Sequence, residues 1–301
     1  MSSKPTGALR HGGAGAGRAA LLLAVLSISW GSILVRLCDS PSWTIAFWRV
    51  ALASCLMAPW GLSAAAVRRA LWPAAGAGLL LALHFATWIA SLSYTSIAAS
   101  TVLVSSQPIF TVLFSWWFLR ETPARPTRLG IALALGGVAL LARGELGLGG
   151  DRLKGDGLAL LGAVFASAYF IVGRTVRERV AFPAYFFLVT ASAAACCGLL
   201  VLLLGQPIRP ASRAELGWLL LMGLVPHVLG HGALNWAVRR LRAYVVNLTV
   251  LGEPVLASFY ALLIFGEAPP PAIYPGALLI GAGVALAVYH ESRAPAPAPP
   301  L

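Results

Sequence analysis

Glu253 is a carboxylate in the middle of an apolar stretch that runs from Tyr244 to Phe265. An ionisable side chain at the centre of a membrane helix is costly, so it is expected to face a cavity or a partner. Pro254, the next residue, removes one helix hydrogen bond and frees the carbonyl group of Val250. We therefore expect Glu253 to bind a substrate or to exchange a proton; the alternative is pairing with an arginine or a histidine that only fixes helix packing.

Gln107 and Pro108 repeat this arrangement in an earlier apolar stretch, where the proline frees the carbonyl group of Val104. Two kinked helices that bring an acid and an amide together near the middle of a membrane are what a discontinuous-helix binding site requires. Gln107 is therefore a second candidate for substrate contact.

Three polar residues, His227, His231 and Asn235, are spaced four apart and share one helix face. A neutral imidazole can bind substrate, and a histidine beside Glu253 can relay a proton because histidine titrates near neutrality. His84 belongs to a similar polar stripe in another apolar stretch. The alternative is hydrogen bonding between helices, which we favour for His227 and His84 and weigh equally for His231 and Asn235.

A histidine pair at this spacing can also hold a metal ion. The sequence has no His-Glu-x-x-His motif, no aspartate-rich diphosphate motif and no Gly-x-Ser-x-Gly nucleophile. We therefore expect no metal and no other cofactor. An intramembrane enzyme, metal-dependent or lipid-modifying, that uses His227, His231 and Glu253 stays as the alternative function.

Arg49 lies early in its own apolar stretch, and its role is open. It can pair with Glu253 or with a substrate carboxylate, or its side chain can snorkel to the membrane surface; we favour a structural role. Aromatic residues on the expected inner helices can stack on an apolar or aromatic substrate. They are Trp30, Trp88, Tyr169 and Trp236.

All of these side chains belong to a chain that is too apolar for an ordinary soluble domain. Of the 301 residues, 59% are hydrophobic and 11% are charged, and the mean hydropathy is +0.82. In soluble domains about a quarter of the residues are charged. The composition therefore predicts an all-α integral membrane protein.

A transmembrane helix needs about 20 apolar residues. Division of the chain at charges and at Pro and Gly breaks predicts ten transmembrane helices, at 19–36, 44–62, 71–92, 97–119, 128–142, 156–173, 184–204, 216–238, 244–265 and 272–289. The Gly/Ala-rich residues 1–18 and the Ala/Pro-rich residues 291–301 cannot bury a core and are expected to be disordered tails.

The net charge of +12 follows from topology in this interpretation. With the N-terminus in the cytoplasm, most of the 22 lysines and arginines fall on the cytoplasmic side, as the positive-inside rule requires. An even number of spans places the C-terminus on the same side. Nucleic acid is therefore not expected as a partner.

The two halves of the chain repeat each other at a constant spacing. The matched residues are Pro108 with Pro254, Glu121 with Glu267, Pro123 with Pro269, Gly130 with Gly276, Leu133 with Leu279, and the sequence Gly-Val-Ala-Leu at 137–140 with the same sequence at 283–286. Such matches favour a duplication, with repeats at 19–145 and 155–290. Five helices per repeat is an odd number, so the second copy enters the membrane in the opposite orientation, as in secondary transporters.

These features together resemble the drug/metabolite transporter superfamily, specifically bacterial carriers with two EamA-type repeats. The resemblance rests on Trp30-Gly31, Arg49, the Pro-to-Glu spacing of Pro108 and Pro254, and the Gly-rich helices that follow, and it covers about residues 19–290. It implies a ten-helix carrier of the bacterial inner membrane, most often an exporter of small metabolites or amino acids. The expected partners are a small-molecule substrate, the lipid bilayer and protons as a candidate coupling ion, with no obligatory protein partner.

Overall fold

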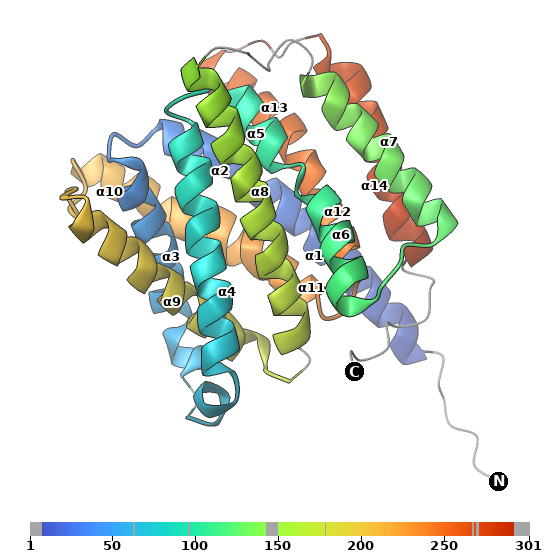
Figure 1. Cartoon of the computed structure of the whole chain (residues 1–301), viewed down its shortest axis with the longest axis horizontal. Coiled ribbons are helices and arrows are strands. Elements are labelled where there is room, and N and C mark those ends of the chain that lie inside the picture. The colour runs from blue at the N-terminus through green and yellow to red at the C-terminus, as the bar shows by residue number, and fades with distance from the viewer. Residues whose placement is uncertain are drawn as a thin grey trace.

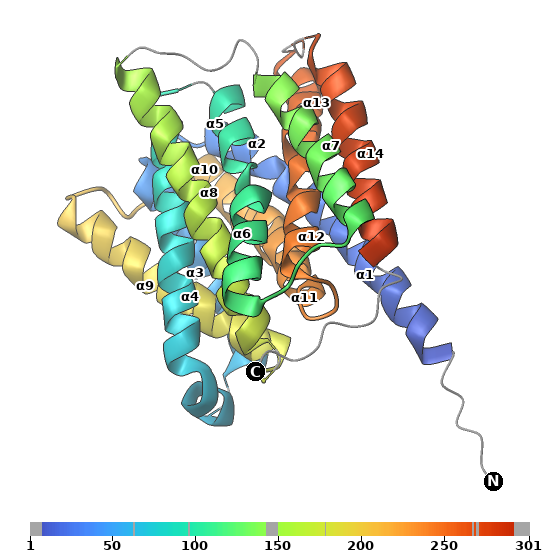
Figure 2. The same cartoon turned by 45° about the vertical axis from the view of Figure 1, so that its right-hand side comes forward.

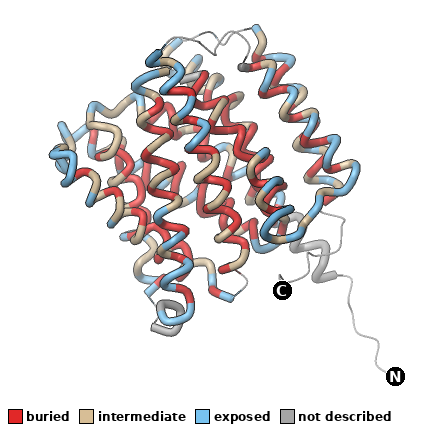
Figure 3. The backbone as a smooth tube through the Cα atoms, viewed as in Figure 1, coloured by how far each residue is buried: buried red, intermediate tan, exposed pale blue. Residues whose placement is uncertain are grey.

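A computed structural model describes residues 8–62, 64–95, 97–142, 150–177, 179–266, 268 and 271–291 (Figure 1). Within these residues the fold is a bundle of helices without a β-strand. The predicted all-α class is therefore confirmed. The apolar faces that the helices turn toward one another carry most of the buried residues, and the outer faces carry most of the exposed ones (Figure 3).

The helices have the following bounds: α1 Ala8–Ile28, α2 Trp30–Arg36, α3 Ser42–Gly61, α4 Ala64–Ser91, α5 Ile97–Val104, α6 Gln107–Leu119, α7 Arg125–Ala142, α8 Gly150–Val176, α9 Phe182–Leu203, α10 Arg213–Met222, the π-helix η1 Gly223–His231, α11 Gly232–Ala237, α12 Ala243–Thr249, the 3-10 turn η2 Val250–Gly252, α13 Glu253–Phe265 and α14 Ile273–Glu291. The first helix thus begins at Ala8, ahead of the expected start of the first span at residue 19.

Eight helical segments in the described part of the chain are long and apolar enough to cross a membrane. They are Ala16–Arg36, Arg68–Ser91, Ala99–Leu119, Gly150–Val176, Phe182–Leu203, Arg213–Ala237, Ala243–Phe265 and Ile273–Glu291. The two other predicted spans correspond to α3, with 20 residues including Arg49, and α7, with 18 residues including Arg125 and Arg128. The count of ten spans stays a prediction.

The fourth and ninth predicted spans are each interrupted near the middle. Residues Ser105 and Ser106 separate α5 from α6, and the single 3-10 turn η2 separates α12 from α13. In both cases the helix after the break carries its proline in the first turn, where no backbone N–H is needed. The kinks expected from Pro108 and Pro254 are therefore short interruptions of regular α-helix, one at Ser105 and Ser106 and one at the 3-10 turn η2.

The eighth predicted span is continuous but irregular. Its middle third, η1, is a nine-residue π-helix that contains Pro226, His227 and His231. The π-helix is rare, and short π segments within α-helices are frequent at functional sites. The sequence did not predict this irregularity, although Pro226 marks its place.

Four packing arrangements hold the interior together (Figures 1 and 2). α4 packs along α8 and α9, α3 along α9, α7 along α14, and α1 against η1 and α11. α6, α12 and η2 lie between these groups. The two helix breaks therefore come to lie inside the bundle.

α7 and α14 cross through two reciprocal glycine contacts. A Cβ atom on Gly130 would lie 2.6 Å from the carbonyl oxygen of Gly283, and one on Gly137 would lie 2.7 Å from the carbonyl oxygen of Gly276. Both separations are shorter than a van der Waals contact. Only glycine therefore allows the two backbones to approach this closely.

Replacing Gly130 by leucine is expected to lower the melting temperature of the detergent-solubilised protein, because overpacking at a fixed crossing costs about 1–3 kcal/mol. The matched control is Gly136→Leu on the same helix, where an added Cβ would meet nothing within 4 Å. Thermal unfolding of the two variants side by side checks the expectation. Equal melting temperatures would contradict the close crossing.

Candidate functional site

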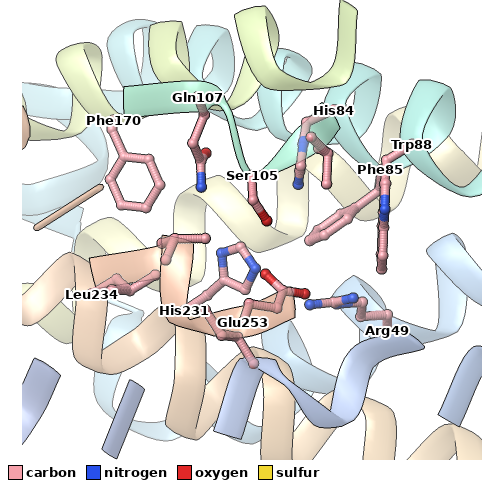
Figure 4. A pocket seen from close by; sticks show the side chains of 13 residues that line it. Arg49, His84, Phe85, Trp88, Ser105, Gln107, Phe170, His231, Leu234 and Glu253 are labelled. Atoms are coloured by element: carbon pink, nitrogen blue, oxygen red, sulfur yellow. The ribbon is translucent and has the colours of Figure 1, made fainter. Parts of the chain in front are cut away.

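A buried pocket lies where the two helix breaks meet (Figure 4). Its volume is about 30 Å³, enough for about two water molecules. The lining residues are Ile28, Arg49, His84, Phe85, Trp88, Val104, Ser105, Gln107, Phe170, His231, Leu234, Val250 and Glu253. They come from α1, α3, α4, α8, η1 and α11 as well as from both broken helices.

Arg49 and Glu253 point toward one another across the pocket and interact electrostatically (Figure 4). Only 2% of Arg49 and 9% of Glu253 is exposed. The Arg49 guanidinium carbon lies 4.2 Å from the ring centre of Phe85, so the ring face stabilises the cation. Snorkelling of Arg49 to the surface is therefore the wrong interpretation, because the side chain is held inside the bundle.

Polar groups from the first break complete the opposite wall of the pocket. Neither Oε1 of Gln107 nor Oγ of Ser105 has a hydrogen-bond partner among the described residues, although both atoms are buried. The Gln107 main-chain carbonyl instead accepts a hydrogen bond from Ser167, at 2.7 Å. A buried polar atom without a partner is costly. These two oxygens are therefore positioned to bind a water molecule or a ligand.

The three intramembrane histidines lie together but differ in role. His231 lines the pocket, and His84, which also lines it, places Nδ1 3.0 Å from the carbonyl oxygen of Gly162. The His227 ring stacks on that of His231 at 5.1 Å and lies 5.6 Å from the Phe85 ring, outside the pocket lining. Among the residues that the structure describes, no three His, Cys, Asp or Glu side chains come together in a way that could hold a metal ion.

The remaining sequence candidates fall into two groups. Trp88 lines the pocket, as expected for a stacking residue. The Asn235 amide donates a hydrogen bond to the Tyr169 hydroxyl, and this buried pair is not part of the lining. Trp30 also lies outside the lining and stacks on Tyr260 with ring centres 4.8 Å apart.

Several lining residues were missed by sequence reasoning. Phe85 follows His84 directly, and Ser105 precedes the Gln107-Pro108 pair by two positions, so proximity to a candidate could have pointed to both. Phe170 and Leu234 are apolar residues in apolar helices. Nothing in their type or spacing separates them from core residues.

The fold and the site together define a class: a multi-pass membrane protein with a buried polar pocket between two broken helices. Residues 16–143 and 153–289 each match the EamA-like transporter family, which together is most of the chain. The chain therefore belongs to the EamA-like transporter family.

Named relatives agree with this assignment. An uncharacterized transporter of Clostridium kluyveri is 29% identical over 59% of this chain and 58% of its own length. The uncharacterized transporter YdfC of Bacillus subtilis is 28% identical over 58% of this chain and 56% of its own length, and solute carrier family 35 member G1 of Mus musculus is 25% identical over 62% and 53%. The chain thus aligns with little more than half the length of these relatives.

A crystal structure of a protein with 20% sequence identity shares the fold. It superposes with a TM-score of 0.74 over 94% of this chain and 98% of the other. At this identity the likeness concerns the fold alone.

Proposed function

We propose that this protein is a secondary carrier that moves a small zwitterionic metabolite, such as an apolar amino acid, across the bacterial inner membrane by alternating access. The pair of opposite charges on Arg49 and Glu253, facing each other across a buried pocket, supports this most directly. In this proposal Arg49 binds the substrate carboxylate and Glu253 binds its ammonium group. The rings of Phe85, Trp88 and Phe170 receive the apolar side chain.

The size of the pocket supports a conformational cycle. A volume of about 30 Å³ holds water molecules but not an amino acid, so the lining helices must separate before the substrate enters. The breaks between α5 and α6 and at η2 are where bending requires the fewest helix hydrogen bonds to change. We infer an occluded arrangement whose two halves open alternately.

The proposed ten spans form two inverted repeats, 19–145 and 155–290, and several features support them. The family matches divide the chain at nearly the same place. Arg120 and Gly266, which end α6 and α13 at corresponding positions, are both left-handed, with φ of 54° and 70°. α4, the third predicted span, packs on α8, the sixth. In the same way η1 and α11, which belong to the eighth predicted span, pack on α1, which belongs to the first, so the same contact recurs when the two halves are exchanged.

The proposed orientation places the end of the bundle at which α4 begins and α8 ends, the lower end in Figure 1, in the cytoplasm, because these helix ends carry Arg68, Arg69 and Arg174. Two ion pairs join helices at this end: Arg242 with Glu291 at 2.7 Å, and Arg174 with Glu121 at 3.7 Å. We propose that they keep the pocket closed on the cytoplasmic side and separate when substrate is loaded for export.

Protons are the proposed coupling ion, with Glu253 as the carrier. Burial disfavours the charged carboxylate, so the group has to be neutralised by Arg49, by a proton or by the substrate ammonium. Competition between the proton and the substrate ammonium group for Glu253 links proton movement to substrate movement. His231 and His84 line the same pocket, and in this proposal they relay the proton.

The test is counterflow in proteoliposomes with amino acids, nucleosides, sugars and cationic drugs, each with and without a pH gradient. We expect saturable counterflow of apolar amino acids, and no competition by amines that lack a carboxylate or by acids that lack an amine. Saturable transport of a sugar or a nucleoside with no amino-acid competition would overturn the zwitterion proposal. Linear, unsaturable conductance would overturn the carrier itself.

A further inference from the structure

A second cavity, separate from the charged pocket, opens on the outer face of the bundle. It has a volume of about 500 Å³ and lies between α1, α14 and the broken segment at η2. We call it the lateral groove; its apolar walls include Leu21 and Val25 of α1 and Val284 and Val288 of α14. The volume is within the usual range of about 300–1,000 Å³ for ligand pockets.

The lateral groove lies inside the membrane. Its three walls belong to the candidate spans Ala16–Arg36, Ala243–Phe265 and Ile273–Glu291. Figure 2 shows α1 and α14 along the right-hand side of the bundle, away from α3, α4 and α9. Because the walls are apolar and the surroundings are lipid, an occupant is drawn from the bilayer rather than from water.

One end of the groove is polar. Arg18 and Tyr289 line it near the start of the candidate span Ala16–Arg36 and the end of α14, and the Arg18 side chain is exposed. An apolar channel with an arginine at its mouth matches a phospholipid, whose hydrocarbon tail enters the channel while its phosphate binds the guanidinium group.

The floor of the groove is the break that carries the central site. Gly252 lines the groove, whereas Val250 and Glu253, its near neighbours, line the charged pocket. A Cβ atom on Gly252 would lie 2.9 Å from Val25 Cγ1, so η2 is packed directly against α1. An occupant of the groove therefore touches the segment that positions Glu253.

We propose that the lateral groove binds one acyl chain of a membrane phospholipid, with the phosphate at Arg18, and that this lipid is a structural ligand of the broken ninth span. The inference rests on the membrane location and on the shape and lining of the groove. It does not depend on which substrate is carried.

The decisive variant is Gly281→Leu. Gly281 lines the groove and an added Cβ there would meet nothing within 4 Å, so a leucine side chain at this position starts in open space and occupies part of the groove. Gly136→Leu is the matched control, because it adds the same side chain at an equally open glycine of α7 that does not line the groove. Arg18→Gln tests the phosphate contact separately.

The measurement is native mass spectrometry of the full-length protein after titration with phosphatidylglycerol. We expect Gly281→Leu to weaken lipid retention by about tenfold or more, because it removes buried CH₂ contacts, while Gly136→Leu matches the wild type. Arg18→Gln is expected to weaken retention to a lesser extent. Equal retention by all four proteins would overturn the proposal.

A measurement of the protein's size in the same samples tests the other possible occupant of the groove, a second copy of this chain. A wild-type dimer that Gly281→Leu converts to a monomer would identify the groove as an interface between two copies and would also overturn the lipid proposal. Since no substrate is present in either measurement, failure here leaves the transport proposal standing. Failure of the counterflow test likewise leaves the lipid proposal standing.

Discussion

Glu253→Gln is expected to lose transport by about 10- to 100-fold and to lose any response to a pH gradient. The amide keeps the shape of the side chain and an acceptor oxygen for Arg49, but it can neither release a proton nor attract an ammonium group. A hydrogen bond to a charged group contributes about 1.5–3 kcal/mol, and each 1.4 kcal/mol corresponds to a factor of ten. The assay is counterflow in proteoliposomes with the pH gradient on and off.

The matched control is Asp151→Asn, the same acid-to-amide exchange at an exposed position in the first turn of α8. It is expected to transport like the wild type. Unchanged flux and unchanged pH response in Glu253→Gln would rule out both the substrate contact and the proton coupling that we propose for this residue.

Arg49→Met is expected to abolish transport and to destabilise the protein, because it leaves the Glu253 carboxylate buried and without its cation. Removal of one partner from a buried charge pair costs about 3–5 kcal/mol. Thermal unfolding in detergent measures the second effect and counterflow measures the first. On its own, this variant does not separate a structural role of Arg49 from a substrate contact.

The double variant Arg49→Met with Glu253→Gln separates the two roles. Both charges are absent, so much of the stability lost in Arg49→Met is expected to return, whereas transport of a zwitterion is expected to stay absent. If the double variant regained both, the two residues would serve only to hold α3 against α13. That result would leave the pocket without a charge-based substrate preference.

The sequence predicted the helix breaks and the main charged residue of the site, because the physical signals there are local. A proline removes a hydrogen bond wherever it stands in a helix, and a carboxylate in an apolar stretch requires compensation wherever it lies. Polar residue type and spacing within apolar stretches therefore indicated Gln107, His84, His231, Arg49 and Glu253, and all of them line the pocket.

Which other side chains face the pocket depends on how each helix is rotated about its own axis, and the sequence does not specify that rotation. Tyr169 and Asn235 lie on helices that reach the pocket, but their side chains pair with one another beside it. Trp30 lies on α2, which contributes no lining residue, and stacks on Tyr260. Phe85 binds the Arg49 cation on its ring face, and nothing in an apolar helix distinguishes that phenylalanine from its neighbours. The orientation of Asn235 also depends on η1, whose irregular winding changes the face on which every later residue of the span appears.

The π-helical geometry of η1 determines which face each later residue of the eighth span presents to the pocket. A π-helix places an extra residue in each turn relative to an α-helix, and one residue of an α-helix corresponds to a rotation of about 100°. If η1 took up α-helical geometry at either end, everything beyond it would turn by about that angle without uncoiling. His231 stands at the last position of η1, on the wall of the pocket, so such a turn would move its imidazole out of the wall and bring a glycine neighbour, Gly230 or Gly232, toward it. Such a rotation would present or withdraw the imidazole that we propose relays the proton.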